Sequence, residues 1–352
     1  MNEIYQKLAI ELDKIPNGFP KTKSGVELKI LAKLFSPEQA QLASSLNLNP
    51  QSVGEVALKN NITEIEAKVM LIGMVKKGLI DLKKDENKGL VFSLIPFVVG
   101  FYERQNAKID KEFAELFEQY YHESFHRSMT AEPSVHRIIP IEKTIPVNID
   151  VMPYQKALNY LDEANAWGVL NCICRVQKKL IGQGGDHPVE NCLVFSTKPG
   201  AFNRTPDIRA LSKSEALEIL AEANKAGLVH STNNAQHDVT YICNCCTCSC
   251  GVLRGIVDHG IKHSVASSDF FAQVDKDLCT GCEVCIDRCQ FGALKMEDGT
   301  CTVDAGFCYG CGLCVTSCAV EALTLIEKDD QNKVVPPLND EAWRKIRAAN
   351  RG

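Results

Sequence analysis

Residues 279–318 read CTGCEVCIDRCQFGALKMEDGTCTVDAGFCYGCGLCVTSC, and this stretch decides the fold of the C-terminal part of the chain. It contains two copies of the spacing C-x2-C-x2-C-x3-C. In each copy, three closely spaced thiolates allow a short loop to wrap three corners of a cubane [4Fe–4S] cluster, while the fourth cysteine ligates the other cluster. The expected ligands are Cys279, Cys282, Cys285 and Cys318 for the first cluster, and Cys308, Cys311, Cys314 and Cys289 for the second.

The two copies belong to an internal repeat, in which Val274 matches Val303. Such a repeat indicates a duplicated fold unit. Residues 270–328 resemble the bacterial dicluster ferredoxin family, and the resemblance implies a ferredoxin fold with two [4Fe–4S] clusters. The family usually has proline after each fourth cysteine, whereas Gln290 and Ala319 stand here, which puts the local loop geometry in question. Zinc, the alternative for paired C-x2-C motifs, does not require the third cysteine of each run.

The composition of the chain is that of a globular protein with an excess of cysteine. It has 352 residues, of which 45% are hydrophobic and 24% charged, and it contains 17 cysteines. The N-terminus lacks the apolar core and cleavage site of a signal peptide. The longest apolar stretch, from Leu90 to Tyr102, is too short to span a bilayer and contains Pro96. We therefore expect a cytoplasmic protein without a membrane span, whose thiols bind metal rather than form disulfides, in an anaerobic or low-oxygen setting.

The charge of the chain is concentrated in its ferredoxin-like segment. The formal net charge is −5, and residues 270–328 contain nine acidic and four basic residues. An acidic surface suits docking onto a basic patch of a redox partner protein. It argues against nucleic acid as a ligand of this segment.

The first 127 residues predict helices followed by a hairpin, which is the outline of a winged helix-turn-helix. The candidate recognition helix begins with Glu64 and Glu66, which would face DNA phosphates unfavourably, and it offers no Arg or Asn to read bases. We therefore favour a protein-interaction or structural module over DNA binding. The local signals are a serine cap and proline at Ser36-Pro37, a capping box between Ser52 and Glu55, a helix over 63–77 closed by Gly78, and strands at 79–82 and 90–95.

Three further segments have plain structural interpretations. The helix expected over 101–125 carries aromatic and histidine side chains that should pack or face solvent rather than bind a cofactor. Prolines mark 128–153 as a linker, and the tail 329–352 predicts a proline stop followed by a short basic helix. The side chains concerned are Tyr120, Tyr121, His122 and His126 in the helix, Pro133, Pro140, Pro146 and Pro153 in the linker, and Trp343 in the tail.

A second internal repeat precedes the ferredoxin-like segment. ALNYLDEANAWGVL at 157–170 matches ALEILAEANKAGLV at 216–229. Each copy predicts an amphipathic helix ended by a glycine, Gly168 or Gly227, and then an extended segment that ends in C-x-C. Residues two apart in a strand point to the same face. Each C-x-C pair should therefore present two thiolates side by side, and the two copies could share one four-thiolate site for a [4Fe–4S] cluster or zinc.

The remaining cysteines of this region are too dense for ordinary packing, so at least two metal centres or one larger cluster is expected. The candidate metal ligands are Cys172, Cys174, Cys192, Cys243, Cys245, Cys246, Cys248 and Cys250. Basic side chains that could hold an anionic cluster, or be solvated, are Arg175, Lys178, Lys179, Arg204, Arg209 and Arg254. His187, His230 and His237 are possible ligands, with a surface or loop position as the default. Cys301 is expected to be a buried structural thiol rather than a ligand.

The CICR, CNCC and GVLRG elements followed by a dicluster ferredoxin resemble a group of multi-cluster iron–sulfur proteins of anaerobes, over about 25–328. The resemblance implies electron transfer in an anaerobic redox system. The predicted fold class is α+β, with a winged-helix-like domain (1–127), a linker (128–153), a duplicated cysteine-rich α/β domain (154–268), a dicluster ferredoxin domain (269–328) and a tail (329–352).

The expected function is the relay of single low-potential electrons between two [4Fe–4S] clusters and one or two further metal centres, which are iron–sulfur rather than zinc. The alternatives are a reductase that acts on a small molecule or disulfide at the cysteine-rich domain, and a redox-sensing DNA-binding regulator. Catalytic residues are not indicated by the sequence. The expected partner is a redox protein.

Overall fold

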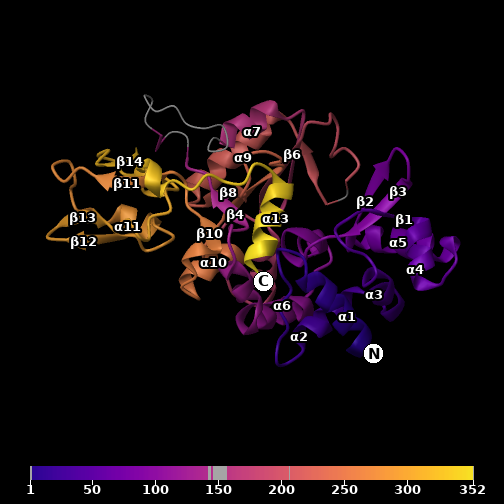
Figure 1. The fold of residues 1–352 in the computed structure, drawn as a ribbon. Coiled ribbons are helices and arrows are strands. Elements are labelled where there is room, and N and C mark those ends of the chain that lie inside the picture. Colours follow the sequence, from indigo (N-terminus) through magenta and orange to yellow (C-terminus); the bar gives the residue numbers. More distant parts are fainter. Residues whose placement is uncertain (1, 142–143, 146–156, 206, 352) are drawn as a thin grey trace. The chain divides into compact units, whose positions relative to one another are not determined.

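The computed structural model describes residues 2–141, 144–145, 157–205 and 207–351 (Figure 1). The linker expected over 128–153 lies partly outside the described residues, including Pro146 and Pro153. The chain divides into two compact units of mixed helices and sheets. The first unit comprises Met1–Ser128, Val176–Gln183 and Arg351–Gly352, and the second comprises Met129–Arg175 and Gly184–Asn350.

The first unit is mostly helical and contains one small sheet. The antiparallel sheet has the strand order β1-β3-β2. Serine or threonine side chains cap α3, α4 and α5, each within a capping box, and Gly78 ends α5 with a φ of 77°. The elements are α1 (Asn2–Asp13), α2 (Val26–Leu34), α3 (Pro37–Ala43), β1 (Gln51–Ser52), α4 (Val53–Asn60), α5 (Glu64–Lys77), β2 (Ile80–Asp85), β3 (Gly89–Leu94) and α6 (Lys111–Glu123). The capped helix starts and the hairpin expected from the sequence are thus confirmed.

The prediction of a helix over 101–125 is wrong for the first half of this range. Residues 103–105 form only a short 3-10 turn, and α6 begins at Lys111. The reason is the Asp110 side chain, which accepts a hydrogen bond from the backbone N–H of Phe113 and so sets the start of the helix. Tyr120 and Tyr121 are fully buried, as expected for packing residues.

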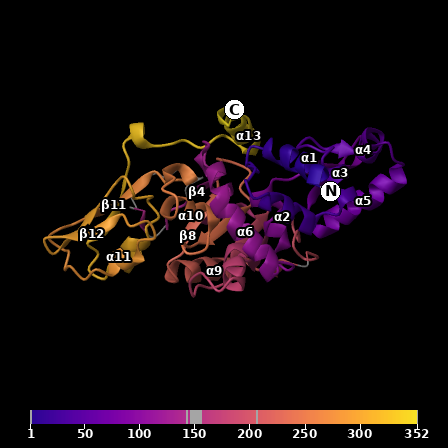
Figure 2. The ribbon, with the colours of Figure 1, turned by 90° about the horizontal axis from the view of Figure 1, so that it is seen from below.

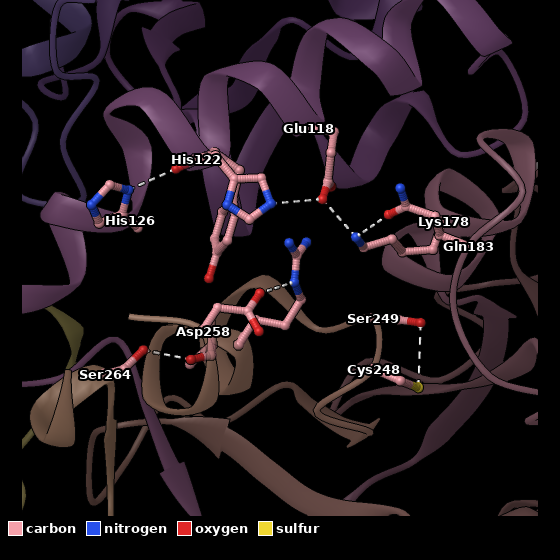
Figure 3. A network of polar contacts seen from close by, with 12 residues as sticks. Glu118, His122, His126, Lys178, Gln183, Cys248, Ser249, Asp258 and Ser264 are labelled. Carbon is pink, nitrogen blue, oxygen red and sulfur yellow. Dashed lines mark hydrogen bonds and ion pairs between the residues drawn. The ribbon is translucent and has the colours of Figure 1, made fainter. Parts of the chain in front are cut away.

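A small polar network in the first unit contains two side chains that the sequence singled out, His122 and Lys178. Glu118 Oε1 lies 3.0 Å from His122 Nε2 and 2.6 Å from Lys178 Nζ (Figure 3). Lys178 Nζ also donates to Gln183 Oε1 over 2.8 Å. The prediction that Lys178 is solvated is therefore wrong, because its side chain is buried and paired with a carboxylate.

The second unit is built on a seven-stranded sheet of order β10-β4-β8-β9-β6-β5-β7 (Figure 1). All neighbours are antiparallel except β10 and β4. The helices α7 and α9 bury Leu161, Ala216 and Leu220 against Val169 and Ile242 of the sheet. The elements are β4 (His136–Ile138), α7 (Ala157–Glu163), β5 (Ala166–Asn171), α8 (Ile173–Leu180), β6 (Glu190–Ser196), β7 (Arg209–Leu211), α9 (Lys213–Lys225), β8 (Val229–Asn233), β9 (Tyr241–Cys245), α10 (Gly251–Val257) and β10 (Val265–Ala266). The residues of α8 are split between the two units.

The two copies of the 157–229 repeat do not fold alike. Gly227 has a φ of 77° just after α9, as expected for a glycine that ends a helix. Gly168 instead lies inside β5, where a Cβ would meet the Ile208 side chain at 2.5 Å, so the glycine allows close packing across the sheet. The expectation of a helix-ending Gly168 is therefore wrong.

The ferredoxin-like part of the second unit repeats the order strand, helix, strand, and Figure 2 labels the first copy, β11, α11 and β12. It contains two antiparallel two-stranded sheets, β11-β14 and β12-β13. The elements are β11 (Phe270–Val274), α11 (Val284–Arg288), β12 (Leu294–Glu297), β13 (Thr300–Val303), α12 (Leu313–Ser317) and β14 (Leu323–Glu327). Its core consists of apolar residues together with buried cysteines, among them Cys285 and Cys314.

The tail forms α13 (Asp340–Asn350), the short basic helix expected from the sequence. It is anchored to the second unit, because Trp343 Nε1 donates to Ser134 O over 2.9 Å and the buried Arg347 donates to Pro133 O over 2.6 Å. Among the described residues, no helix has the length and apolar character needed to cross a membrane.

Candidate metal centres

The eight ferredoxin cysteines gather around two separate hollows. One hollow is lined by Cys279, Cys282, Cys285 and Cys318, and the other is lined by Cys289, Cys308, Cys311 and Cys314. Each hollow thus has three thiols from one motif and the fourth from the other. This is the grouping that the spacing predicts.

Two glycines allow the backbone to lie close to these hollows. Gly281 and Gly310 both have a φ of 67°, and a Cβ would lie 2.6 Å from Gly299 O in the first case and 2.2 Å from Phe270 O in the second. Any larger residue would displace the loop that carries Cys282 or Cys311. The loop geometry therefore depends on these glycines.

The surroundings of the sulfurs favour metal-bound thiolates. Backbone N–H groups of Ala272, Ala293 and Cys301 donate to Cys308, Cys289 and Cys279 over 3.3–3.5 Å. Burial raises the pKa of Cys311 to about 12, so metal cations are needed to hold its thiolate form near neutral pH. Four soft thiolates with N–H donors to sulfur fit an iron–sulfur cluster.

Cys301 lies in the wall of the first hollow and is only 2% exposed, so its predicted burial is confirmed. Its Sγ is 3.6 Å from Cys285 Sγ. Burial and the hydrogen bond with Cys285 raise the pKa of Cys301 to about 12. A neutral thiol therefore stands beside a candidate ligand.

Six of the eight middle-region cysteines are brought together by strand pairing. Within the sheet, Cys192 of β6 pairs with Leu170 of β5, and the next residue, Leu193, pairs with Ile242 of β9. This register places the ends of β5, β6 and β9 side by side. The cysteines concerned are Cys172 after β5, Cys174 in α8, Cys192 in β6, Cys243 and Cys245 in β9, and Cys250 before α10.

The six thiols form a closed ring of contacts, which we call the six-thiol ring. Neighbours in the ring hydrogen bond in the order Cys172, Cys174, Cys250, Cys245, Cys243, Cys192 and back to Cys172. The expected C-x-C geometry is confirmed for Cys243 and Cys245. For Cys172 and Cys174 the predicted extended backbone is wrong, because α8 begins at Ile173 and Cys174 belongs to a helix, but the two thiols still lie side by side.

The thiols of the ring cannot all ionise by themselves. Hydrogen bonds to neighbouring thiols, together with burial, raise the pKa of Cys174, Cys192, Cys243 and Cys245 well above the usual range. Hydrogen bonds with Cys174 and Cys192 lower the pKa of Cys172 well below its usual value, against the opposing effect of burial. A thiolate at one position therefore opposes ionisation of the neighbouring thiol. Cations are required to hold the ring in its deprotonated form, as in a metal–thiolate centre.

Arg175 supplies one fixed positive charge next to the ring. Its side chain is 1% exposed and donates only to neutral acceptors, Pro188 O over 3.0 Å, Asn191 Oδ1 over 2.7 Å and Asn244 O over 2.6 Å. No carboxylate pairs with it among the residues that the structure describes. The charge–charge interactions of Arg175 are with thiols, Cys172 first. A buried guanidinium of this kind needs an anionic partner, which the sulfur atoms can provide.

Cys246 and Cys248 are outside the six-thiol ring. Their sulfurs and one ring nitrogen of His187 all lie within 4.8 Å of one another.

The other two candidate histidines differ from His187. His230 is buried in β8, where its Nδ1 lies 2.6 Å from Asn244 Oδ1 and burial lowers its pKa to about 4, whereas His237 is exposed. The default surface position is therefore wrong for His230.

Comparison with known proteins supports the chemistry of the C-terminal part. Residues 272–295 match the family model of the 4Fe-4S binding domain. The chain carries a 4Fe-4S binding domain. Over 39 residues it is 46% identical to one of the subunits of the H(2):CoB-CoM heterodisulfide, ferredoxin reductase of Methanothermobacter marburgensis. That similarity covers 11% of this chain and 6% of the relative. These matches support iron–sulfur chemistry in the C-terminal part of the chain.

Gln290, which occupies the usual proline position of the 4Fe-4S domain, connects that domain to the middle region. Its Oε1 accepts hydrogen bonds from N and Oγ1 of Thr247, each over 2.9 Å, and its Nε2 donates to Gly227 O over 2.7 Å. Thr247 lies between Cys246 and Cys248. The sequence signal for this role was only the departure from the family pattern.

The other basic candidates do not form a cluster-binding patch. Arg209 pairs with Glu190 over 2.7 Å, and Arg254 pairs with Asp258 over 2.8 Å (Figure 3 shows Asp258). Lys179 and Arg204 are exposed. Of the six basic side chains that the sequence singled out, Arg175 alone interacts with the candidate cysteines without a carboxylate partner among the described residues.

Proposed function

We propose that the chain relays single low-potential electrons between two [4Fe–4S] clusters and a further iron–sulfur centre in the six-thiol ring, and that it serves a redox partner protein. The convergence of three cysteines from one motif and one from the other on each hollow carries the proposal. The proposed ligand sets are Cys279, Cys282, Cys285 and Cys318, and Cys308, Cys311, Cys314 and Cys289. The clusters supply the one-electron chemistry when bound.

The six-thiol ring supports a third centre through its donor set. Soft thiolates select iron–sulfur clusters or other thiophilic metals, and six thiols exceed the four that one tetrahedral ion or one cubane needs. The buried Arg175 charge favours an anionic occupant. The polypeptide would hold the centre, exclude water from it through the buried Cys172, Cys245 and Cys250, and stabilise its negative charge.

The contacts of Gln290 support a route between the two regions. Gln290 follows Cys289, a proposed ligand, and it hydrogen bonds to Thr247 in the cysteine-rich loop. Two cysteine-containing segments are thereby held together by direct hydrogen bonds. A short covalent and hydrogen-bonded path is suited to electron transfer between them.

For the first unit we propose a winged helix-turn-helix that binds protein rather than DNA. The order of α3, α4, α5 and the β2–β3 hairpin, with β1 added to β3, supports this fold. On α5, Ala67, Leu71 and Met74 are buried, whereas Ile65 is 78% and Val69 69% exposed. Exposed apolar residues beside glutamates suit a protein surface better than phosphates. A redox-dependent shift of DNA mobility at low salt would overturn this proposal and support a regulator.

A reductase is the second candidate, favoured by one observation. Cys246 and Cys248 stand outside the six-thiol ring, next to the Thr247 contact with the 4Fe-4S domain. One electron from each of two clusters, with two protons from solvent, would reduce one disulfide to two thiols. The test is consumption of a small disulfide by the reduced protein, compared between the native chain and Cys246→Ser. Equal rates would exclude this reductase role.

The main test is the iron and acid-labile sulfide content of anaerobically purified protein, with EPR of the reduced form. We expect about 12 Fe or more per chain, because two ferredoxin clusters account for about 8. Cys289→Ser and Cys314→Ser should alter the same EPR signal, and Cys285→Ser the other. About 8 Fe would remove the third centre, and a signal shared by Cys285 and Cys289 would overturn the ligand sets.

A further inference from the structure

The direction of the chain after β9 separates Cys246 and Cys248 from the cysteines of the six-thiol ring. Adjacent residues of a strand point to opposite faces, so Cys246 cannot follow Cys245 into the six-thiol ring. Cys248 follows two residues later, before α10 begins at Gly251. His187 approaches both from the loop between α8 and β6. Three metal-binding side chains from two segments are thus brought to one place outside the ring.

The separation of these ligand atoms suits a single ion. Around a tetrahedral ion with bonds of about 2.0–2.3 Å, ligand atoms are roughly 3.5–4 Å apart. The two sulfurs and the imidazole nitrogen lie within 4.8 Å of one another, so small side-chain movements would bring all three to one ion. The spacing of the three atoms therefore suits one shared ion.

We propose that Cys246, Cys248 and His187 bind one zinc ion, separate from the iron–sulfur centres. Two thiolates and one imidazole are a usual zinc donor set. No fourth histidine, cysteine or carboxylate joins the group among the residues that the structure describes. Three protein ligands leave one coordination position for water or another small exchangeable ligand, which is the pattern of catalytic rather than structural zinc.

The loops that carry the three ligands are held by further contacts. The backbone of Gly185 hydrogen bonds to Cys248, and a Cβ at Gly185 would lie 3.2 Å from the Cys248 sulfur and 3.3 Å from the His187 ring. Glycine therefore allows the two loops to approach. Thr247, between the two cysteines, is fixed by Gln290. Such outer contacts orient ligands in metal sites.

Accessibility differs among the three ligands. Cys246 is 1% exposed, whereas Cys248 and His187 are half-buried. The group is therefore anchored on its Cys246 side and remains partly open on the side of the other two ligands. A small molecule can reach an ion held there.

The test measures zinc and iron in the same samples of the full chain, purified anaerobically, supplied with zinc and washed with a chelator. We expect about one zinc per chain. His187→Ala and Cys248→Ser should remove zinc without loss of iron, whereas Cys243→Ser should lower iron and leave zinc. His237→Ala, which changes an exposed histidine elsewhere, is the matched control and should retain both metals.

The outcomes separate this proposal from the proposed function. Absence of zinc from the native chain, its retention in His187→Ala, or loss of iron with zinc in that variant would overturn the zinc site. Because His187 lies in a loop, His187→Ala tests the site even if Cys248→Ser fails to fold. A normal zinc pattern with only about 8 Fe would leave the zinc site intact and remove the third iron–sulfur centre.

The open position is tested by replacing zinc with Co2+ in the same protein. Thiolate-bound Co2+ should give sulfur-to-metal charge-transfer absorption that is missing from His187→Ala. Addition of 2-mercaptoethanol should shift the visible spectrum of the native chain, because the thiol can occupy the fourth position. An unchanged spectrum would show that the coordination is closed.

Discussion

The two cysteine-rich regions of the second unit contain equal numbers of candidate ligands but assemble them differently. In the 4Fe-4S domain, three ligands of each hollow come from one loop, such as 279–285. The six-thiol ring instead draws on three strands and the starts of two helices between Cys172 and Cys250. Local spacing builds the first kind of site, and the pairing of β5, β6 and β9 builds the second. The two regions should therefore depend on metal in different ways.

Removal of iron should have the largest effect, and it should be confined to the 4Fe-4S domain. The core of this domain is small and includes Cys285 and Cys314, so loss of the clusters would remove part of what holds it together. The seven-stranded sheet has an independent core around Leu161, Val169 and Ile242. In hydrogen exchange of iron-free protein, β11 and β14 should lose protection by orders of magnitude, whereas β5 and β6 should retain it. Equal loss in both regions would contradict the comparison.

Loss of the Arg175 charge should destabilise the region around the six-thiol ring, where strand pairing positions the thiols. Arg175→Met removes three hydrogen bonds from a buried cation and should lower the free energy of unfolding by about 3 kcal/mol or more. A positive charge stabilises a reduced, more negative centre, so the potential of the proposed ring centre should also fall. Denaturant unfolding and redox titration measure the two effects.

Arg175→Lys is the matched control, because it retains the positive charge and loses only the planar set of guanidinium N–H donors. It should keep most of the potential and lose part of the stability. If Arg175→Met left both quantities unchanged, the guanidinium would have no anionic partner.

These differences also explain what the sequence could predict. The two hollows follow from spacing within short loops, and the starts of α4 and α5 follow from Ser52 and Thr63 with their partners three residues later. The division of CNCC into Cys245, which faces the ring, and Cys246, which leaves it, depends on strand register. That register is set by tertiary pairs such as Leu193 with Ile242, which no local pattern reveals.

The failure at Gly168 has the same origin. Both repeat copies contain a glycine at the same place, and helix-ending glycine is the commoner role. The first helix ends earlier, at Glu163, and Gly168 lies within β5, where the absence of a side chain makes room for Ile208. Equal sequence patterns therefore gave unequal local structures once packing between strands decided the outcome.

Gln290 offers a smaller effect at the boundary between the two regions. Gln290→Pro removes hydrogen bonds to Thr247 and Gly227, each worth about 1 kcal/mol. Hydrogen exchange at Thr247 should become faster, by roughly tenfold to a hundredfold, with unchanged iron content. Ala319→Pro, at the equivalent position of the other half, changes an exposed residue and should leave Thr247 as it was. Equally faster hydrogen exchange at Thr247 in both variants would show that Gln290 does not connect the two regions.

The smallest effect is expected at Cys301, which belongs to none of the proposed ligand sets. If Cys285 binds iron as a thiolate, the proton in the 3.6 Å contact must belong to Cys301. Cys301→Ala then removes one weak donor to a ligand sulfur, and the backbone N–H that donates to Cys279 remains. A weak hydrogen bond of at most about 1 kcal/mol corresponds to roughly 40 mV for one electron.

The potential of one cluster in Cys301→Ala should therefore fall by at most about 40 mV, while iron content stays that of the native chain. Redox titration followed by EPR resolves such a shift. Loss of about four irons would instead make Cys301 a ligand, and local spacing would then no longer suffice to describe the 4Fe-4S domain. Proximity to a cluster hollow, which Cys301 has, would in that case matter more than membership of the C-x2-C-x2-C-x3-C pattern.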